Sequence, residues 1–295
     1  MHRFSVRTAC AAFATALLGA CASPGASQRA LEHVREFDGV RVEAETAWMA
    51  ESVRDAALDV LPRVLLFEGF AMQDEIRIVV RAALDHAIDG RRYADRIEID
   101  IPESVRSGRV EGLRLLVAHE IGHHVLDASW RRLPALLEEG LVEFVAQRAV
   151  PDEAPTRRAI LALLLAADQG EGISLAAPTQ SDPGPRARWK LEPGYRSVSP
   201  REALELSRYD FFELPIASRQ VSTALGWRLV EDRGVHGLRA TVRAEANVPR
   251  GPEAWWNALG RAAPIRPISL AEILGIVGPE EVSALERWRT AQVQR

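Results

Sequence analysis

The spacing of apolar and polar residues predicts helices and strands in different parts of the chain. Residues 31–62 have apolar positions at helical spacing, which predicts a helix. Residues 76–80 (IRIVV) and 96–101 (RIEIDI) predict strands, because both are rich in β-branched residues and the second alternates isoleucines with acidic residues. Residues 113–126 are apolar on most sides and predict a buried helix. Residues 135–147 have the pattern of an amphipathic helix.

The remainder of the chain completes an α+β organisation. Residues 160–167 are apolar but lie between charged residues, which predicts a core helix rather than a membrane span. The stretch 170–200 is rich in Gly, Pro, Ser and Arg, so we expect a long loop region within 151–200. We therefore expect an αβ lobe over 31–150 with a small mixed sheet, followed by a helical C-terminal lobe over 201–295.

The predicted buried helix contains the motif His-Glu-Ile-Gly-His at residues 119–123. Two histidines four residues apart lie on one helical face, so His119 and His123 can reach a single zinc ion. Glu120 projects close to that face and can take a proton from the attacking water as a general base. A helix with two surface histidines and an ordinary glutamate is the alternative. It fits less well, because buried His and Glu side chains need partners and a metal provides one.

Catalytic zinc usually has three protein ligands and one water, so a third ligand is expected downstream. Residues 136–146 read LLEEGLVEFVA, which offers Glu138, Glu139 and Glu143. This segment resembles the glutamate helix of the gluzincins, the zinc peptidases related to thermolysin and to the leukotriene A4 hydrolase type of aminopeptidase. The resemblance implies that Glu139, which precedes Gly140, binds zinc. It also implies that Glu143, one turn later, holds a zinc-bound histidine from behind.

Spacing favours a different assignment of the third ligand. Fifteen residues separate His123 from Glu139 and 19 separate it from Glu143, and the longer spacing is closer to that of gluzincins. We prefer Glu139, because connecting loops tolerate changes of length while ligand geometry does not. Glu143 stays open as the alternative ligand. Glu138 is expected on a solvated helix face.

Further resemblances to gluzincins extend the prediction along the chain. The strand 96–101 precedes the zinc helix like the gluzincin edge strand, which pairs with substrate backbone, although a plain core strand fits equally well. Residues 217–234 (ASRQVSTALGWRLVEDRG) resemble the C-terminal helices of that group. A Tyr or His there often stabilises the oxyanion of the tetrahedral intermediate. The candidates here are Tyr195, Tyr209 and His236, and Tyr209 is preferred.

The N-terminal residues predict a signal for secretion. A basic start and a short apolar run end in Leu-Gly-Ala-Cys at residues 18–21, which resembles a bacterial lipobox. The resemblance implies a signal peptide over 1–20, lipidation of Cys21 and a flexible tether over 21–30. Because Ala22 follows the cysteine, an anchor in the outer membrane at its periplasmic face is implied. An ordinary signal peptide cut near Ala22 or Ala26 is the alternative.

Composition narrows the range of partners. The formal net charge is -4, lysine occurs only at position 190, and no basic stripe is present, so nucleic acid is not an expected partner. Together, the motifs predict a lipid-anchored gluzincin-type zinc metallopeptidase of the bacterial cell envelope, with Zn²⁺ as cofactor and peptides or proteins as substrates. The alternatives are a catalytically silent zinc-binding scaffold and a zinc hydrolase of a non-peptide amide.

Overall fold

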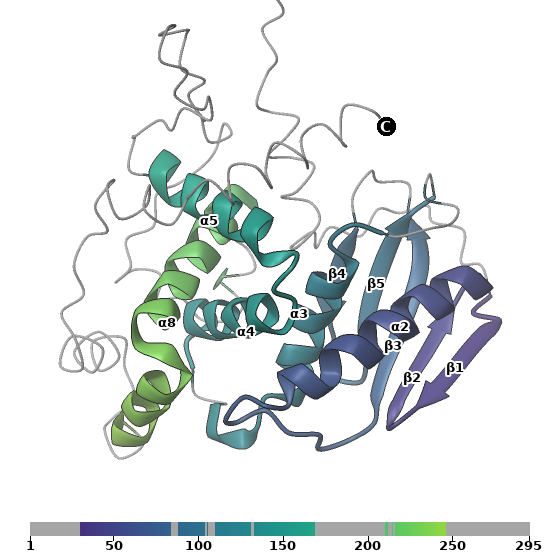
Figure 1. Cartoon of the computed structure of the whole chain (residues 1–295), viewed down its shortest axis with the longest axis horizontal. Coiled ribbons are helices and arrows are strands. Elements are labelled where there is room, and N and C mark those ends of the chain that lie inside the picture. The colour runs from purple at the N-terminus through teal and green to yellow at the C-terminus, as the bar shows by residue number, and fades with distance from the viewer. Residues whose placement is uncertain are drawn as a thin grey trace, which may run out of the picture.

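The computed structural model describes residues 30–83, 88–103, 105, 110–130, 133–168, 210–211, 214 and 216–245. Within these residues a five-stranded mixed sheet lies beside five helices, which confirms the α+β class (Figure 1). The elements in chain order are β1 (His33–Phe37), β2 (Val40–Ala44), α2 (Ala47–Val64), β3 (Ile76–Ala83), β4 (Asp89–Arg92), β5 (Ile97–Pro102), α3 (Leu113–Val125), the short 3₁₀ helix η1 (Ala128–Trp130), α4 (Ala135–Ala149), α5 (Ala154–Asp168) and α8 (Ile216–Glu245).

The expected helix over 31–62 is wrong in its first part, where the chain forms the antiparallel β1–β2 hairpin. The turn between the strands is Asp38-Gly39, whose φ angles of 39° and 78° are the left-handed values that a tight hairpin turn requires. Helix α2 begins only after Thr46, whose hydroxyl accepts a hydrogen bond from the Met49 amide. The helical spacing of apolar residues therefore predicts a helix correctly only for the part of this segment that forms α2.

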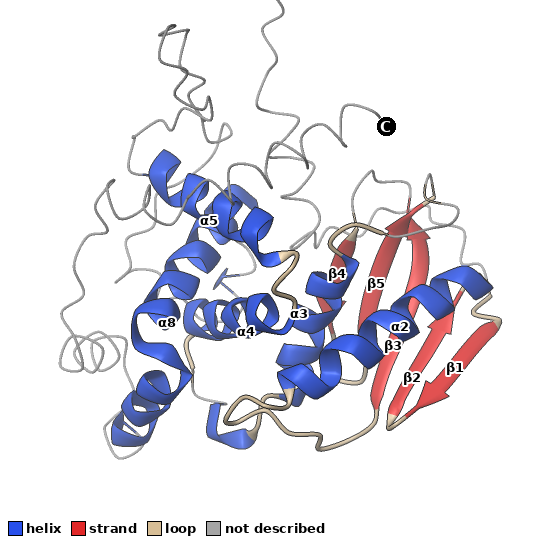
Figure 2. Ribbon diagram, in the orientation of Figure 1, coloured by secondary structure: helices blue, strands red, loops and turns tan. Residues whose placement is uncertain are grey.

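The sheet has the strand order β1-β2-β3-β5-β4, with β2, β3 and β5 parallel and both edge strands antiparallel to their neighbours (Figure 2). Strand β5 matches the segment expected from its alternating isoleucines, but it lies inside the sheet. The plain core-strand reading is thus correct for it, and the edge position belongs to β4. This four-residue strand pairs Gly90 with Ile99 and was not expected from the sequence.

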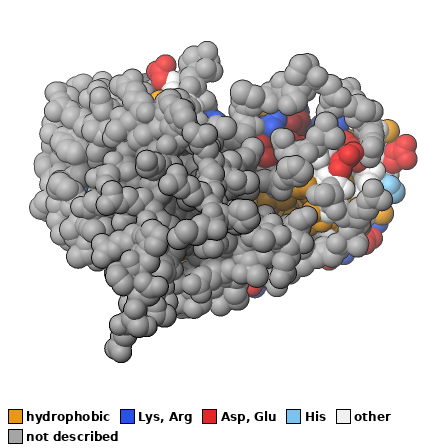
Figure 3. All heavy atoms as spheres, turned by 90° about the horizontal axis from the view of Figure 1, so that it is seen from above, with side chains coloured by type: hydrophobic (Ala, Val, Ile, Leu, Met, Phe, Trp, Pro, Cys, Tyr) orange, Lys and Arg blue, Asp and Glu red, His pale blue; other side chains and the backbone are white. Residues whose placement is uncertain are grey.

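The two faces of the sheet differ in chemistry. Ile97, Ile99 and Ile101 are fully buried on the face that α2 and α3 cover. The opposite face has ion pairs, in which Glu43 binds both Arg41 and Arg77 at 2.7 Å. At the sheet end of the molecule, acidic and basic side chains lie among apolar ones (right side of Figure 3). The apolar face therefore positions α3 over the β5–β4 edge.

Helices α4 and α8 cross with their backbones in direct contact. A Cβ atom added at Gly140 would lie 2.0 Å from the carbonyl carbon of Gly226, so this crossing requires glycine. Helix α8 bends at Gly234, where φ is 68° and ψ is 164°. The close crossing fixes one side of α4 against α8 and leaves the other side to face α3.

The C-terminal half agrees in part with the expected organisation. Helix α5 occupies the first part of 151–200, where a long loop region was expected, and it includes the expected core helix at 160–167. The later part of that region, and 246–295 of the expected helical lobe, lie outside the described residues. None of the helices in the described part has the length and apolar character that a membrane span requires.

Candidate metal centre

Helix α3 holds the HExxH motif in a buried position. It begins after Gly112, which has a φ of 78°, and packs against α4. His119, Glu120 and His123 are only 3%, 4% and 5% exposed, so the alternative of surface histidines is wrong. The two imidazole rings lie one turn apart, with centroids separated by 4.9 Å. Both therefore project from the same side of the helix.

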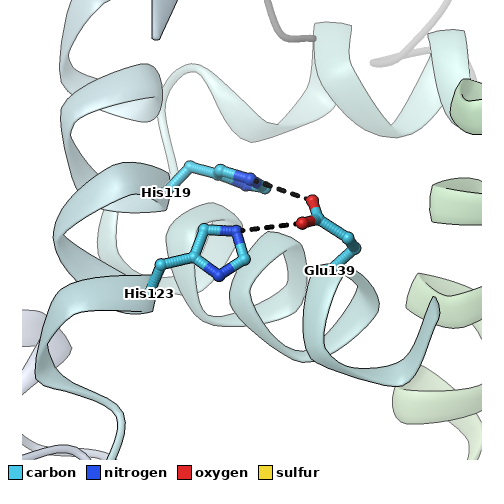
Figure 4. Close-up of side chains that lie close together, drawn as sticks. All are labelled: His119, His123 and Glu139. Atoms are coloured by element: carbon cyan, nitrogen blue, oxygen red, sulfur yellow. Dashed lines mark ion pairs between the residues drawn. The ribbon is translucent and has the colours of Figure 1, made fainter. Parts of the chain in front are cut away.

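A glycine inside the motif brings the second helix close. A Cβ atom at Gly122 would lie 2.9 Å from Cγ1 of Val142, so the missing side chain lets α4 approach α3. Helix α4 in turn presents Glu139, which is 3% exposed, to both histidines. The carboxylate lies opposite the two rings and directs one oxygen toward each of them, as Figure 4 shows.

The distances in this group suit a small cation. His119 Nε2 lies 3.4 Å from Glu139 Oε2, and His123 Nε2 lies 3.3 Å from Glu139 Oε1. Two imidazole nitrogens and a carboxylate are donors that zinc uses in proteins, and here each oxygen of the one carboxylate faces one ring. Moreover, Glu139 Oε2 is buried without a hydrogen-bond partner among the described residues. His119, His123 and Glu139, whose ligand atoms lie within 4.8 Å of one another, could therefore hold a metal ion.

The other ring nitrogen of each histidine faces a second carboxylate. Glu143 Oε2 lies 3.5 Å from His119 Nδ1, the place that the gluzincin resemblance implied for it. Glu138 Oε1 lies 3.0 Å from His123 Nδ1 and 3.7 Å from Nη1 of Arg92. The expectation that Glu138 lies on a solvated face is thus wrong, since α4 turns that residue toward α3. Both Nε2 atoms are left to face Glu139.

Glu120 lies against the edge strand β4. A Cβ atom at Gly90 would lie 2.8 Å from both Cγ and Oε1 of Glu120 and equally close to Cδ1 of Leu116. The backbone of β4 therefore passes directly beside the carboxyl group. Burial raises the pKa of Glu120, against the opposing effect of His119 and His123, so this carboxyl has an increased affinity for a proton.

The ligand group is strongly coupled when no metal is present. Burial alone would lower the pKa of His119, but Glu139 and Glu143 outweigh it and raise the pKa to about 10. For His123 the same balance, with Glu139 and Glu138 as the partners, raises the pKa to about 9. Burial opposes ionisation of Glu139, yet the two histidines hold its pKa well below the usual range. Positive charge is thus favoured between these side chains, from protons or from a metal.

One buried residue near the site was missed by the sequence reasoning. Arg157, on α5, binds the Glu143 carboxylate with two hydrogen bonds of 2.8 Å. In the sequence it only marks the polar boundary of a core helix. No local pattern could identify it, because its contact with Glu143 depends on how α5 packs beside α4.

The remaining candidates, and the polar residues that follow the motif, are not part of this group or lie outside the described residues. His236 is 89% exposed at its side chain and contacts Glu68 at 3.2 Å. His124 is half-buried, and burial lowers its pKa. Asp127 lies 3.6 Å from Nη2 of Arg239. Tyr195, Tyr209 and Cys21 lie outside the described residues.

Comparison with known proteins adds no assignment to this geometry. Neither the models of protein families nor the curated proteins match the chain. The functional conclusion therefore depends on the site itself.

Proposed function

We propose that this protein is a zinc-dependent peptidase of gluzincin type with a zincin-like catalytic domain. The observation that carries the proposal is the placement of three buried side chains. The Nε2 atoms of His119 and His123 face the two oxygens of the Glu139 carboxylate at 3.4 and 3.3 Å, and this donor set is one that zinc uses in proteins. The base of the same motif, Glu120, lies beside them on α3. A group that only bound a metal would have no use for that residue.

Each side chain has a role in peptide hydrolysis. Bound zinc would supply a Lewis acid that brings the pKa of a water molecule near neutrality and polarises the substrate carbonyl. Glu120 accepts a proton from this water as the water oxygen bonds to the carbonyl carbon. Glu120 then passes the proton to the amide nitrogen, so that the C–N bond breaks and the amine leaves neutral.

The edge strand supports a peptide as the substrate. Strand β4 is the last strand of the sheet in the described part of the chain, and Gly90 brings its backbone against Glu120. An extended peptide that added to this edge would place its own backbone beside the general base. The gluzincin resemblance suggested that residues 96–101 pair with the substrate backbone. We propose that β4 pairs with the substrate instead.

The N-terminal segment supports a place in the bacterial cell envelope. Cleavage before Cys21 and acylation of its thiol would anchor the enzyme to a lipid bilayer, with residues 21–30 as the tether. A short tether of this kind would keep the catalytic domain in the periplasm, at the surface of the outer membrane.

The test measures zinc content and cleavage of an unbiased peptide library for the wild type and for Glu120→Gln. Wild-type protein should bind one zinc ion and cleave peptides. Glu120→Gln should keep the zinc and lose activity by orders of magnitude, because only the proton acceptor is changed. His119→Ala should lose the zinc, while His124→Ala, next to the site on the same helix, should keep both zinc and activity.

Two results would favour the alternatives. A wild-type protein that binds zinc but cleaves no peptide would favour a silent zinc-binding scaffold. Hydrolysis of amides other than peptides, identified by mass spectrometry of the products, would favour a different zinc hydrolase. Loss of zinc from Glu120→Gln would show that the assigned roles are wrong.

A further inference from the structure

A buried arginine from a third helix, α5, binds the Glu143 carboxylate that faces Nδ1 of His119. Arg157, on α5, is 3% exposed, and Glu143 is 1% exposed. The Nε and Nη2 atoms of Arg157 donate to Oε1 and Oε2 of Glu143, each at 2.8 Å. Two parallel bonds of this kind fix the plane of a carboxylate as well as its position. Gln147 Nε2 adds a third bond to Oε1 at 2.9 Å.

This arrangement determines which oxygen faces the histidine. Oε1 of Glu143 accepts from both Arg157 and Gln147, while Oε2 accepts from Arg157 and lies 3.5 Å from His119 Nδ1. His119 Nδ1 is buried and has no hydrogen bond of its own within the described residues. The nearest carboxylate oxygen that the structure offers it is therefore the one that Arg157 holds in place.

Stability alone is a weak explanation for this ion pair. Burying two charges costs much of what their attraction returns, and replacing a buried pair with neutral side chains is often nearly neutral for folding. A role in fixing the geometry of the metal site explains the pair better. The imidazole ring of His119 can rotate unless its Nδ1 side is held, and rotation would turn Nε2 away from Glu139.

We propose that Arg157 is a positioning residue of the metal centre. It holds Glu143 so that Glu143 fixes the His119 ring with Nε2 directed toward Glu139. The inference rests on the proposed function in one respect, that His119 is a zinc ligand, and it does not require that the protein hydrolyse peptides. Lysine could not replace Arg157 fully, since it lacks the planar fork that makes two parallel bonds.

The experiment separates positioning from folding. Zinc affinity would be measured by competition with a chelator, and the visible absorption of the Co²⁺-substituted protein would report ligand geometry. Thermal unfolding of the metal-free proteins would report stability. The variants are Arg157→Met, Arg157→Lys and the double variant Glu143→Gln with Arg157→Met, which leaves no buried charge without a partner.

Arg157→Met should bind zinc more weakly than the wild type, by up to the roughly 10–100-fold that loss of a histidine's own partner costs, because Glu143 is then no longer held in place beside His119. It should also change the Co²⁺ absorption bands. The zinc affinity of Arg157→Lys should lie between those of the wild type and Arg157→Met. The double variant should regain most of the stability of the metal-free wild type but keep the weak zinc binding, because His119 is still not held by an oriented carboxylate.

Arg114→Met is the matched control. Arg114 lies on α3 with His119, but within the described residues it pairs with Asp59, Asp152 and Glu153 and not with either histidine. Its loss should lower stability and leave zinc affinity unchanged in the folded protein.

Two outcomes in the variants would overturn the inference alone. Zinc affinity within about two-fold of the wild type in Arg157→Met would do so, and so would recovery of zinc affinity together with stability in the double variant. If Arg157→Met does not fold, the double variant provides the test. A wild-type protein without zinc affinity would refute the metal site and this inference together, whereas tight zinc binding without peptide cleavage would refute only the proposed peptidase.

Discussion

His119 and His123 each have two ring nitrogen atoms, and the structure gives these atoms different surroundings. Nδ1 of His119 faces Glu143 and Nδ1 of His123 faces Glu138, while both Nε2 atoms face Glu139. A metal ligand with one ring nitrogen held from behind has a fixed tautomer and orientation. Both rings therefore present Nε2 to Glu139, in a buried space that gathers several carboxylates.

Gly90 provides a test of the contact between β4 and Glu120, the proposed general base. In Gly90→Ala, the new Cβ would lie 2.8 Å from Cγ and Oε1 of Glu120, so that side chain must move. Because efficient proton transfer depends on sub-ångström placement, we expect kcat to fall by about 10²-fold with zinc content unchanged. Steady-state kinetics and metal analysis would check this. Gly237→Ala, where the nearest atom to the added Cβ is 3.5 Å away, is the control.

The opposite result for Gly90→Ala would be informative. Unchanged kcat would mean that Glu120 can leave the β4 backbone without loss, and the proposed role of the edge strand would then lose its support.

At the residue scale, the sequence predicted what is local to one helix. His119, Glu120 and His123 follow from a fixed spacing within α3, whereas Glu139 was implied by the resemblance of its Glu-Gly pair to gluzincins, and the residue count favoured Glu143. Glu138 and Arg157 were not predicted as parts of the site. Which face of α4 meets α3, and which helix lies behind it, are tertiary facts that a periodic pattern does not contain.

At the scale of elements, the strongest patterns predicted the fold correctly and short ones did not. The isoleucines of β5 predicted a strand because alternation requires one face to be buried. Strand β4 reads Asp-Gly-Arg-Arg and has no apolar alternation, so only its pairing with β5 makes it a strand. The β1–β2 hairpin contains an Asp-Gly turn signal that was outweighed by the helical spacing of the residues after it.

The crossing of α4 and α8 gives a prediction at this scale. A Cβ atom at Gly140 would overlap the backbone of Gly226 at 2.0 Å, and backbone cannot yield as a side chain can. We expect Gly140→Ala to destabilise the protein by about 3 kcal/mol or more. Since 1 kcal/mol corresponds to about 2–4 °C in proteins of this size range, the thermal midpoint should fall by about 6–12 °C.

Gly122→Ala is the comparison for that measurement. Its Cβ would meet only Cγ1 of Val142, at 2.9 Å, which is a side-chain atom. The gain in helix propensity, about 1 kcal/mol, offsets part of the cost of repacking. Thermal unfolding should therefore rank Gly140→Ala well below Gly122→Ala, and an equal loss in both would show that α4 and α8 can separate easily.

At the scale of the whole molecule, the proposed lipid anchor is independent of the metal site. Cys21 should be acylated, because it ends a Leu-Gly-Ala-Cys sequence after a short apolar run. Cys21→Ser should abolish metabolic labelling by a palmitate analogue and release the protein from the membrane fraction. Cys10→Ser, within the predicted signal peptide, should leave labelling intact. Absence of label in the wild type would refute the lipoprotein assignment.

The coupling of protons and metal predicts how the stability of the whole molecule depends on pH. In the metal-free protein the pKa values of His119 and His123 are raised to about 10 and 9, above about 6.5 in the unfolded chain. Their contribution to stability is complete below pH 6.5 and is lost as the pH rises through 9 and 10. Glu139 and Glu143 have lowered pKa values, so their contribution is present above about pH 4.5 and is lost as the pH falls. Metal-free protein should therefore be most stable between about pH 5 and 6.5.

Zinc should reverse this trend on the alkaline side. Zinc binds neutral histidines, so binding near pH 7 must displace the protons of His119 and His123. Apparent zinc affinity should then rise by up to about 100-fold per pH unit, and the increase in thermal midpoint that a fixed zinc concentration produces should grow from pH 6 to pH 8. Thermal unfolding with and without zinc across this range would measure the effect, and calorimetry in buffers of different ionisation enthalpy would count the protons released.

His119→Ala should show almost no zinc-dependent increase in thermal midpoint at any pH. A zinc effect of constant size from pH 6 to pH 8 in the wild type would show that the histidines are already neutral in the metal-free protein, and that the buried carboxylates do not hold protons on them.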